Sequence, residues 1–73
     1  MSVISFEEAR TLTLARLRQW LKEVPVAERS RPRIIIDFKP YSILDLIREV
    51  EQGTDVGRKY VYDTAKKLGY AVS

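Results

Sequence analysis

The sequence predicts a small α+β fold: helix, strand, helix and helix in chain order, with a candidate short strand at the C-terminus. Apolar residues recur at helical spacing in three segments, which predicts three amphipathic helices. Between the first two of these lies a short segment rich in β-branched and aromatic residues, which is typical of a strand. The 73 residues have room for one domain, which we assign to residues 1–73.

The first predicted helix covers residues 5–24. Ser5 followed by Glu8 matches a capping box, in which each side chain accepts a hydrogen bond from the other residue's backbone N–H. Most apolar residues of the segment fall within one broad arc of the helical wheel, and Pro25 ends the pattern. Arg10 lies inside that arc, so we expect its long side chain to carry the charge out to solvent.

The only strong strand candidate follows a linker. Residues 25–32 are polar and bracketed by prolines, and we expect them to be extended. Residues 33–38 then form the strand. Alternation places Ile34, Ile36 and Phe38 on one face and the intervening side chains on the other face.

The predicted strand needs a partner, because a lone strand leaves its backbone groups unpaired. One candidate is the same strand of a second chain, which makes the protein a homodimer. Short chains without disulfides or a metal often gain stability by oligomerising, which favours this arrangement. The other candidate is antiparallel pairing with residues 70–72, in a monomeric α+β domain whose three helices cover one side of the sheet.

Two more helices are predicted at residues 42–52 and 55–68. Ser42 and Asp45 repeat the capping-box spacing at the start of the first of these helices. Gly53 stands where a helix commonly ends in a left-handed residue. The sequence therefore predicts a tight corner between the two helices.

The corner segment of residues 53–59 allows two interpretations. It offers backbone N–H groups at the start of a helix, followed by Arg58 and Lys59, and such helix N-termini accept phosphate oxygens. Alternatively, it is an ordinary corner in which Gly57 lets the helices pack closely. The spacing does not match a phosphate-binding loop, and Glu49 stands where a helix-turn-helix unit usually has a small residue.

Absent residue types exclude several classes of function. The chain has no Cys and no His, so it lacks disulfides, a thiolate nucleophile and the commonest metal ligand and proton carrier. We therefore expect no enzyme, no catalytic residue, no metal site and no cofactor. No apolar run nears the ~20 residues of a membrane-spanning helix and no secretion signal is visible. We expect a cytoplasmic protein without membrane contact.

Residues 33–69 resemble the ribbon-helix-helix family of repressors, and Arc-type repressors in particular. The resemblance is carried by the strand and proline of Ile34-Ile35-Ile36-Asp37-Phe38-Lys39-Pro40, the helix Ser42-Ile43-Leu44-Asp45-Leu46-Ile47-Arg48-Glu49-Val50 and the turn Gly53-Thr54. In that family two chains pair their strands into a ribbon, whose outward side chains enter the major groove of DNA. The resemblance implies that the bases are faced by Arg33, Ile35, Asp37 and Lys39, and that phosphate is anchored by Gly53 and Thr54. It also implies that the opposite face of the strand, with Ile34, Ile36 and Phe38, lies toward the core.

Two functions are therefore expected, in order of preference. The first is a small, non-enzymatic, dimeric regulator of transcription that binds double-stranded DNA, for which the net charge of +3 is suitable. Its candidate nucleic-acid-binding residues are Arg29, Arg31, Arg33, Lys39, Gly53, Thr54, Arg58 and Lys59. The alternative is a protein–protein interaction adaptor or accessory factor that binds no nucleic acid and uses exposed aromatic residues such as Tyr41 or Tyr62 as anchors.

Overall fold

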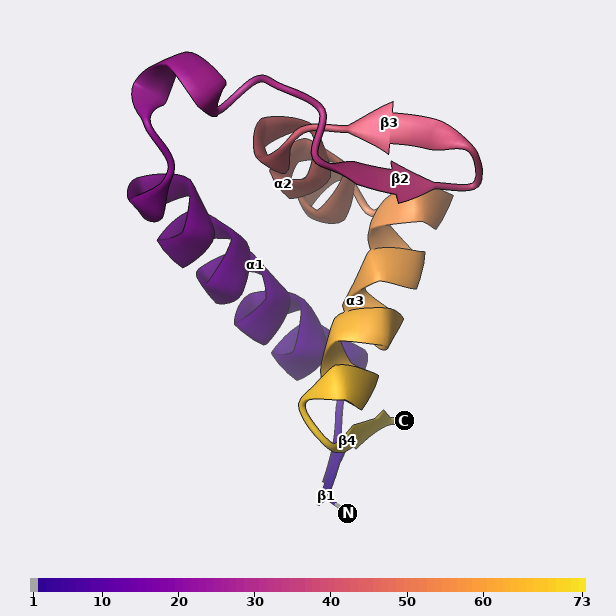
Figure 1. The fold of residues 1–73 in the computed structure, drawn as a ribbon. Coiled ribbons are helices and arrows are strands. Elements are labelled where there is room, and N and C mark those ends of the chain that lie inside the picture. Colours follow the sequence, from indigo (N-terminus) through magenta and orange to yellow (C-terminus); the bar gives the residue numbers. More distant parts are fainter. Residues whose placement is uncertain (1) are drawn as a thin grey trace.

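The computed structural model describes residues 2–73 and confirms the small α+β fold. Its elements follow in the order β1 (Ser2–Ile4), α1 (Phe6–Glu23), the single 3₁₀ turn η1 (Val26–Glu28), β2 (Ile34–Ile36), β3 (Lys39–Tyr41), α2 (Ile43–Gln52), α3 (Asp55–Lys67) and β4 (Tyr70–Val72). Figure 1 shows α1 and α3 diverging from the end of the molecule that holds both termini, and the β2–β3 hairpin lying at the opposite end, over α2 and the start of α3.

The helix ends form as their sequence signals predict. The Ser5 hydroxyl accepts a hydrogen bond from the Glu8 N–H at 3.1 Å, and the Ser42 hydroxyl accepts one from the Asp45 N–H at 3.1 Å. Gly53 ends α2 with a left-handed backbone, at φ 67°. These three predicted helix ends are therefore confirmed. They could be predicted because each depends only on residues at most four apart in sequence.

The pairing predicted within the chain is wrong. β2 pairs not with β4 but antiparallel with β3, so that Ile34 lies opposite Tyr41 and Ile36 opposite Lys39. Pairing of β2 with the same strand of a second chain stays a prediction. The predicted strand 33–38 ends early because Asp37 and Phe38 both adopt positive φ values, 51° and 67°, and form a two-residue turn. Type I′ hairpin turns need positive φ at both central positions.

Residues 70–72 form a strand as expected, but pair parallel with β1, with Val3 opposite Ala71. The Ser73 N–H extends this pairing by donating to the Ile4 carbonyl at 2.9 Å. The reason lies in α3, whose 13 residues span about 20 Å. The helix starts beside the hairpin and therefore delivers β4 to the far end of the molecule.

The linker is not wholly extended. Pro25, at φ −54°, precedes the η1 turn, in which the Glu28 N–H donates to the Pro25 carbonyl at 2.8 Å. The fixed φ of proline suits the first position of such a turn. The chain therefore folds back once before it enters β2.

The core lies where the three helices meet. Its buried apolar residues are Ala9, Leu14, Leu17 and Val24 around α1, Ile43, Leu46 and Val50 of α2, and Val61 and Ala65 of α3. Ile34, Ile36 and Tyr41 of the hairpin pack against this cluster from one side. Phe38 does not, although the family resemblance implied a core position; its side chain is fully exposed, at 101 %.

The corner between α2 and α3 depends on Gly57. A Cβ at this position would collide with the Glu49 carbonyl and would lie 2.7 Å from the Val50 nitrogen. The close packing expected of Gly57 is therefore confirmed, and the small residue that the crossing needs stands on the second helix. Arg10 also stabilises this corner. Its guanidinium donates hydrogen bonds to the carbonyls of Val50 (3.3 Å) and Glu51 (3.0 Å) at the end of α2.

Candidate functional site

The structure brings the start of α3 beside the hairpin turn, but it leaves Arg29, Arg31 and Arg33 at the other end of the hairpin. Lys59, in the first turns of α3, places its Nζ 2.8 Å from Oδ1 of Asp37 in the hairpin turn. This hydrogen bond and the charge of Asp37 hold the pKa of the Lys59 ammonium above its ordinary value. Lys39 and Arg58 therefore lie on elements that meet at the hairpin turn.

The two arginines of the linker, and Arg33 directly after it, are held by local contacts. The Glu28 carboxylate lies 3.9 Å from the Arg31 guanidinium and 3.8 Å from that of Arg33. The Nε of Arg29 donates to the Val24 carbonyl at 3.4 Å. Exposed pairs of this kind contribute little to stability, but the carboxylate offsets the positive potential of the linker.

The start of α3 is also occupied by contacts within the chain. The Thr54 hydroxyl accepts from the Gly57 N–H at 3.1 Å and lies 3.0 Å from Oε1 of Glu49, to which it can donate. The hydroxyl that the family resemblance assigns to phosphate is therefore already bonded, with a carboxylate beside it. Gly53 supplies the left-handed end of α2. Arg58 extends over the ring of Phe6, 5.8 Å from its centroid.

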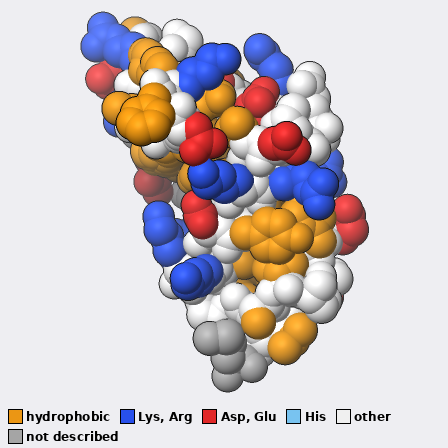
Figure 2. Space-filling view, turned by 90° about the vertical axis from the view of Figure 1, so that its right-hand side faces the viewer, with side chains coloured by type: hydrophobic (Ala, Val, Ile, Leu, Met, Phe, Trp, Pro, Cys, Tyr) orange, Lys and Arg blue, Asp and Glu red, His pale blue; other side chains and the backbone are white. Residues whose placement is uncertain are grey.

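Charges of both signs are intermixed on this side of the molecule. Figure 2 shows it from the side on which α3 and the hairpin turn lie, with acidic side chains between the basic ones around a central hydrophobic patch. Nucleic-acid-binding surfaces more often carry a basic patch or stripe. Binding of DNA by this surface remains a prediction.

The aromatic anchors named from the sequence differ in exposure. Tyr41 lies on the inner face of the hairpin and packs against the core. Tyr62 is exposed on α3, and its ring centroid lies 5.5 Å from that of Phe6. Of the two, only Tyr62 is therefore available to a partner.

The feature that sequence reasoning missed is the outer face of the hairpin. Ile35 is 75 % exposed there and lies opposite Pro40, which is exposed as well, while Phe38 projects from the turn. In a hairpin with a two-residue turn, the pair that closes the turn, here Ile36–Lys39, is hydrogen-bonded, and the pairs alternate from there. The Ile35–Pro40 pair is therefore a non-hydrogen-bonded pair. Proline, which has no N–H, removes no hydrogen bond between the strands at this position. We call Ile35, Phe38 and Pro40 the hairpin patch. Pro40, so soon after a β-branched run, was the available signal for an exposed two-stranded hairpin.

Phe38 has a backbone conformation that is unfavourable for a phenylalanine. Its φ of 67° lies in the left-handed region, where a residue with a Cβ is destabilised by about 1–2 kcal/mol. Glycine is preferred at this second position of a type I′ turn. No packing compensates the cost, because the ring is fully exposed. A strained, exposed aromatic residue suggests a function outside the folding of the monomer.

Comparisons with known proteins leave this description unchanged. No protein-family model, curated protein or solved structure matches the chain. The resemblance to ribbon-helix-helix repressors therefore remains a prediction. Within residues 2–73, none of the helices combines the length and the apolar character needed to cross a membrane.

Proposed function

We propose that this chain is a protein-interaction module that binds a partner protein through the hairpin patch, with Phe38 as the anchor. The observation that carries the proposal is the fully exposed Phe38 ring on a left-handed backbone. Aromatic residues dominate the binding energy of many protein interfaces, usually by filling a pocket on the partner. Ile35 extends the apolar contact along the strand.

The surroundings of the patch suggest the chemistry of the partner. Residues 28–39 contain the four cations Arg29, Arg31, Arg33 and Lys39 against the two carboxylates Glu28 and Asp37, a net charge of +2. Charges around the rim of an interface select partners of the opposite sign and speed up association. We therefore expect an apolar pocket surrounded by acidic residues.

The contribution of Phe38 can be estimated. Moving a phenylalanine side chain from water into an apolar pocket contributes about 2–3 kcal/mol, which is about a 30- to 150-fold change in affinity. Phe38→Ala should weaken binding by this factor. The same substitution should leave the fold unchanged, because the ring makes no contact with the core.

The experiment places a photo-crosslinking amino acid at position 39, next to the anchor, in the full chain. The reference chain should form a specific adduct in an extract of the cells that produce it, and Phe38→Ala should lose that adduct. Val26→Ala is the matched control, because Val26 is also highly exposed (76 %) but lies on η1. Equal adducts with and without Phe38, or equal loss in the Val26 variant, would refute the proposal. An adduct of twice the chain mass would identify the partner as a second copy.

Binding to duplex DNA is the second candidate function. The Lys59–Asp37 contact favours it, because this contact joins the basic residues of the hairpin to those of α3. It predicts an affinity that falls steeply with salt, since phosphate binding is driven by release of counterions. An amide NMR titration with a DNA duplex at low and moderate salt tests it. Arg33→Glu should abolish DNA-dependent shifts if DNA is the ligand and should matter little if the partner is a protein.

A further inference from the structure

A concave site lies away from the hairpin patch, between the diverging helices α1 and α3. Its volume is about 570 Å³, within the usual range for small-molecule sites. The lining side chains come from both walls: Thr13, Arg16, Leu17, Gln19, Trp20 and Glu23 from α1, and Tyr60, Thr64, Lys67 and Leu68 from α3 and its end. We call this space the α1–α3 cleft.

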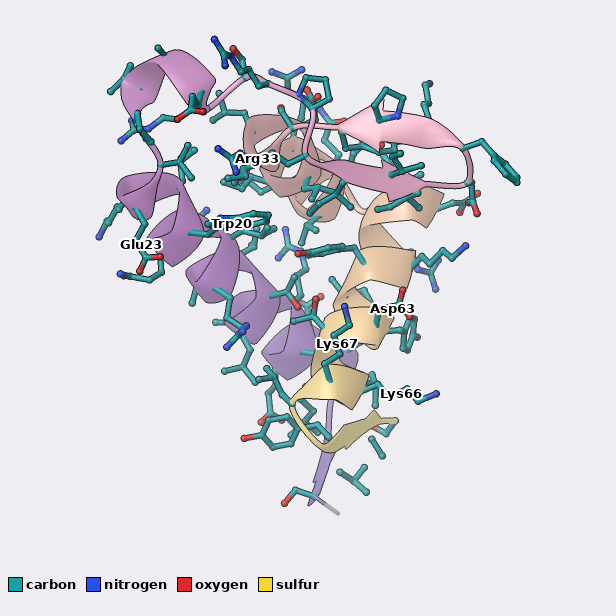
Figure 3. The ribbon with its side chains drawn as sticks, in the orientation of Figure 1. Trp20, Glu23, Arg33, Asp63, Lys66 and Lys67 are labelled. Carbon is teal, nitrogen blue, oxygen red and sulfur yellow. The ribbon has the colours of Figure 1, made fainter. Side chains whose placement is uncertain are left out.

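Two cations line the cleft, one from each wall. Arg16 lines it from α1 and Lys67 from α3. Neither forms an ion pair with any carboxylate among residues 2–73. Figure 3 shows the Lys67 side chain running along α3, whereas the neighbouring Lys66 points to the side of α3 that lies away from α1. Two cations that line one cleft and have no carboxylate partner favour an anionic ligand there.

Two aromatic rings line the same cleft, one from each wall. Trp20 extends from α1 toward α3 (Figure 3), and Tyr60 lines the opposite side; both are half-buried. Burial raises the pKa of the Tyr60 hydroxyl, while a hydrogen bond with Thr64 and the positive charge of Arg16 act in the opposite direction. The Arg16 charge is therefore close enough to act on the phenol from across the cleft. Rings that are packed on one side and open on the other offer a stacking surface to a flat ligand.

The polar groups are ordered along the cleft. Seven residues separate Arg16 from Glu23, which is about 10 Å along α1. Arg16 and the Glu23 carboxylate therefore lie at different positions along the α1 wall. Gln19 lies between them in sequence and donates to Glu23 at 3.4 Å. A ligand matched to this wall has an anionic group near Arg16 and hydrogen-bond donors near Glu23.

We propose that the α1–α3 cleft binds a small organic anion that carries a flat ring, of the class of the nucleoside monophosphates. The phosphate binds between Arg16 and Lys67, and the base packs against Trp20 and Tyr60. Glu23 accepts hydrogen bonds from amino or hydroxyl groups of the base or sugar. This site is independent of the hairpin patch, so each proposal can fail without the other.

The test uses the fluorescence of Trp20, the only tryptophan in the chain. The probes are adenosine monophosphate, uridine monophosphate, adenosine without phosphate, inorganic phosphate and a short single-stranded oligonucleotide. We expect a saturable change in fluorescence with the monophosphates, and about tenfold weaker binding of adenosine or phosphate alone. The indole N–H cross-peak in NMR spectra should shift with the same midpoint. Tighter binding of the oligonucleotide would identify a strand of nucleic acid as the source of the nucleotide.

Lys67→Met and its matched control Lys66→Met locate the site. Both replace an exposed lysine in the last turn of α3 and keep the length of the side chain. Lys67→Met should weaken binding of the monophosphates about tenfold, and Lys66→Met should leave it unchanged. Equal weakening by the two variants, or no saturable change with any probe, would overturn the proposal.

Discussion

Replacing Phe38 by glycine should stabilise the protein while it removes the proposed anchor. Phe38 occupies the second position of a two-residue turn at φ 67°, directly after Asp37 at φ 51°. Phe38→Gly changes this turn to Asp-Gly, one of the pairs preferred in type I′ turns. No buried contact is lost, because the Phe38 side chain is fully exposed.

The size of the effect follows from two opposing terms. Relief of the left-handed strain contributes about 1–2 kcal/mol. The greater freedom of glycine in the unfolded chain subtracts about 0.5–1 kcal/mol. The free energy of unfolding should therefore rise by up to about 1.5 kcal/mol, with a midpoint of about 0.75 kcal/mol. For a domain of this size that midpoint raises the Tm by about 3–6 °C.

Thermal unfolding followed by circular dichroism measures this shift, with Phe38→Ala as the control. Alanine removes the ring but keeps a Cβ at the same φ, so its Tm should stay close to that of the reference chain. A Tm that falls in both variants would show that the ring stabilises the fold. That result would refute the strain argument and with it the interpretation of Phe38 as an anchor.

Three further predictions concern the scaffold. Gly57→Ala should destabilise the protein by about 3 kcal/mol or more in urea unfolding, because the added Cβ would meet the Glu49 backbone. Gly53→Ala should destabilise it by about 1–2 kcal/mol, because the added Cβ has open space but the backbone φ is 67°. Leu46→Ala should cost about 2–5 kcal/mol by the same assay, since Leu46 is fully buried. A hydrogen bond from the Ser42 N–H lowers the pKa of Asp45 in the folded protein below the ordinary value of 3.8. The ionised carboxylate therefore stabilises the fold above pH 3.8, and this stabilisation is lost as the pH falls through the pKa of the folded state. Asp45→Asn should therefore flatten the acid limb of a plot of stability against pH.

The parts of the fold that could be predicted are those encoded locally. The caps at Ser5 and Ser42 and the end of α2 at Gly53 each follow from a few neighbouring residues. The β2–β3 hairpin could not be predicted from its turn, because Asp-Phe is not a preferred type I′ pair. A short β3 that contains a proline also carries a weak strand signal.

The role of Arg10 and the state of the basic residues needed the tertiary structure. Arg10 was expected to reach solvent, yet it donates to carbonyls about forty residues further along the chain. The linker arginines were identified as cations, but their shared partner Glu28 became visible only once η1 brought the groups together. Charge counted along the chain therefore overestimated the positive character of the predicted site.

The parallel pairing of β1 and β4 has a mechanical consequence. The chain enters through β1 and leaves through β4, and Ser73 adds one more hydrogen bond, to the Ile4 carbonyl. Tension that pulls the two ends of the chain apart therefore slides these strands past each other and loads all of their cross-strand bonds at once. In the antiparallel β2–β3 hairpin, tension on the two open ends would instead break the bonds one after another. Under tension, the β1–β4 pair would therefore act as a clamp that must shear before the helices separate.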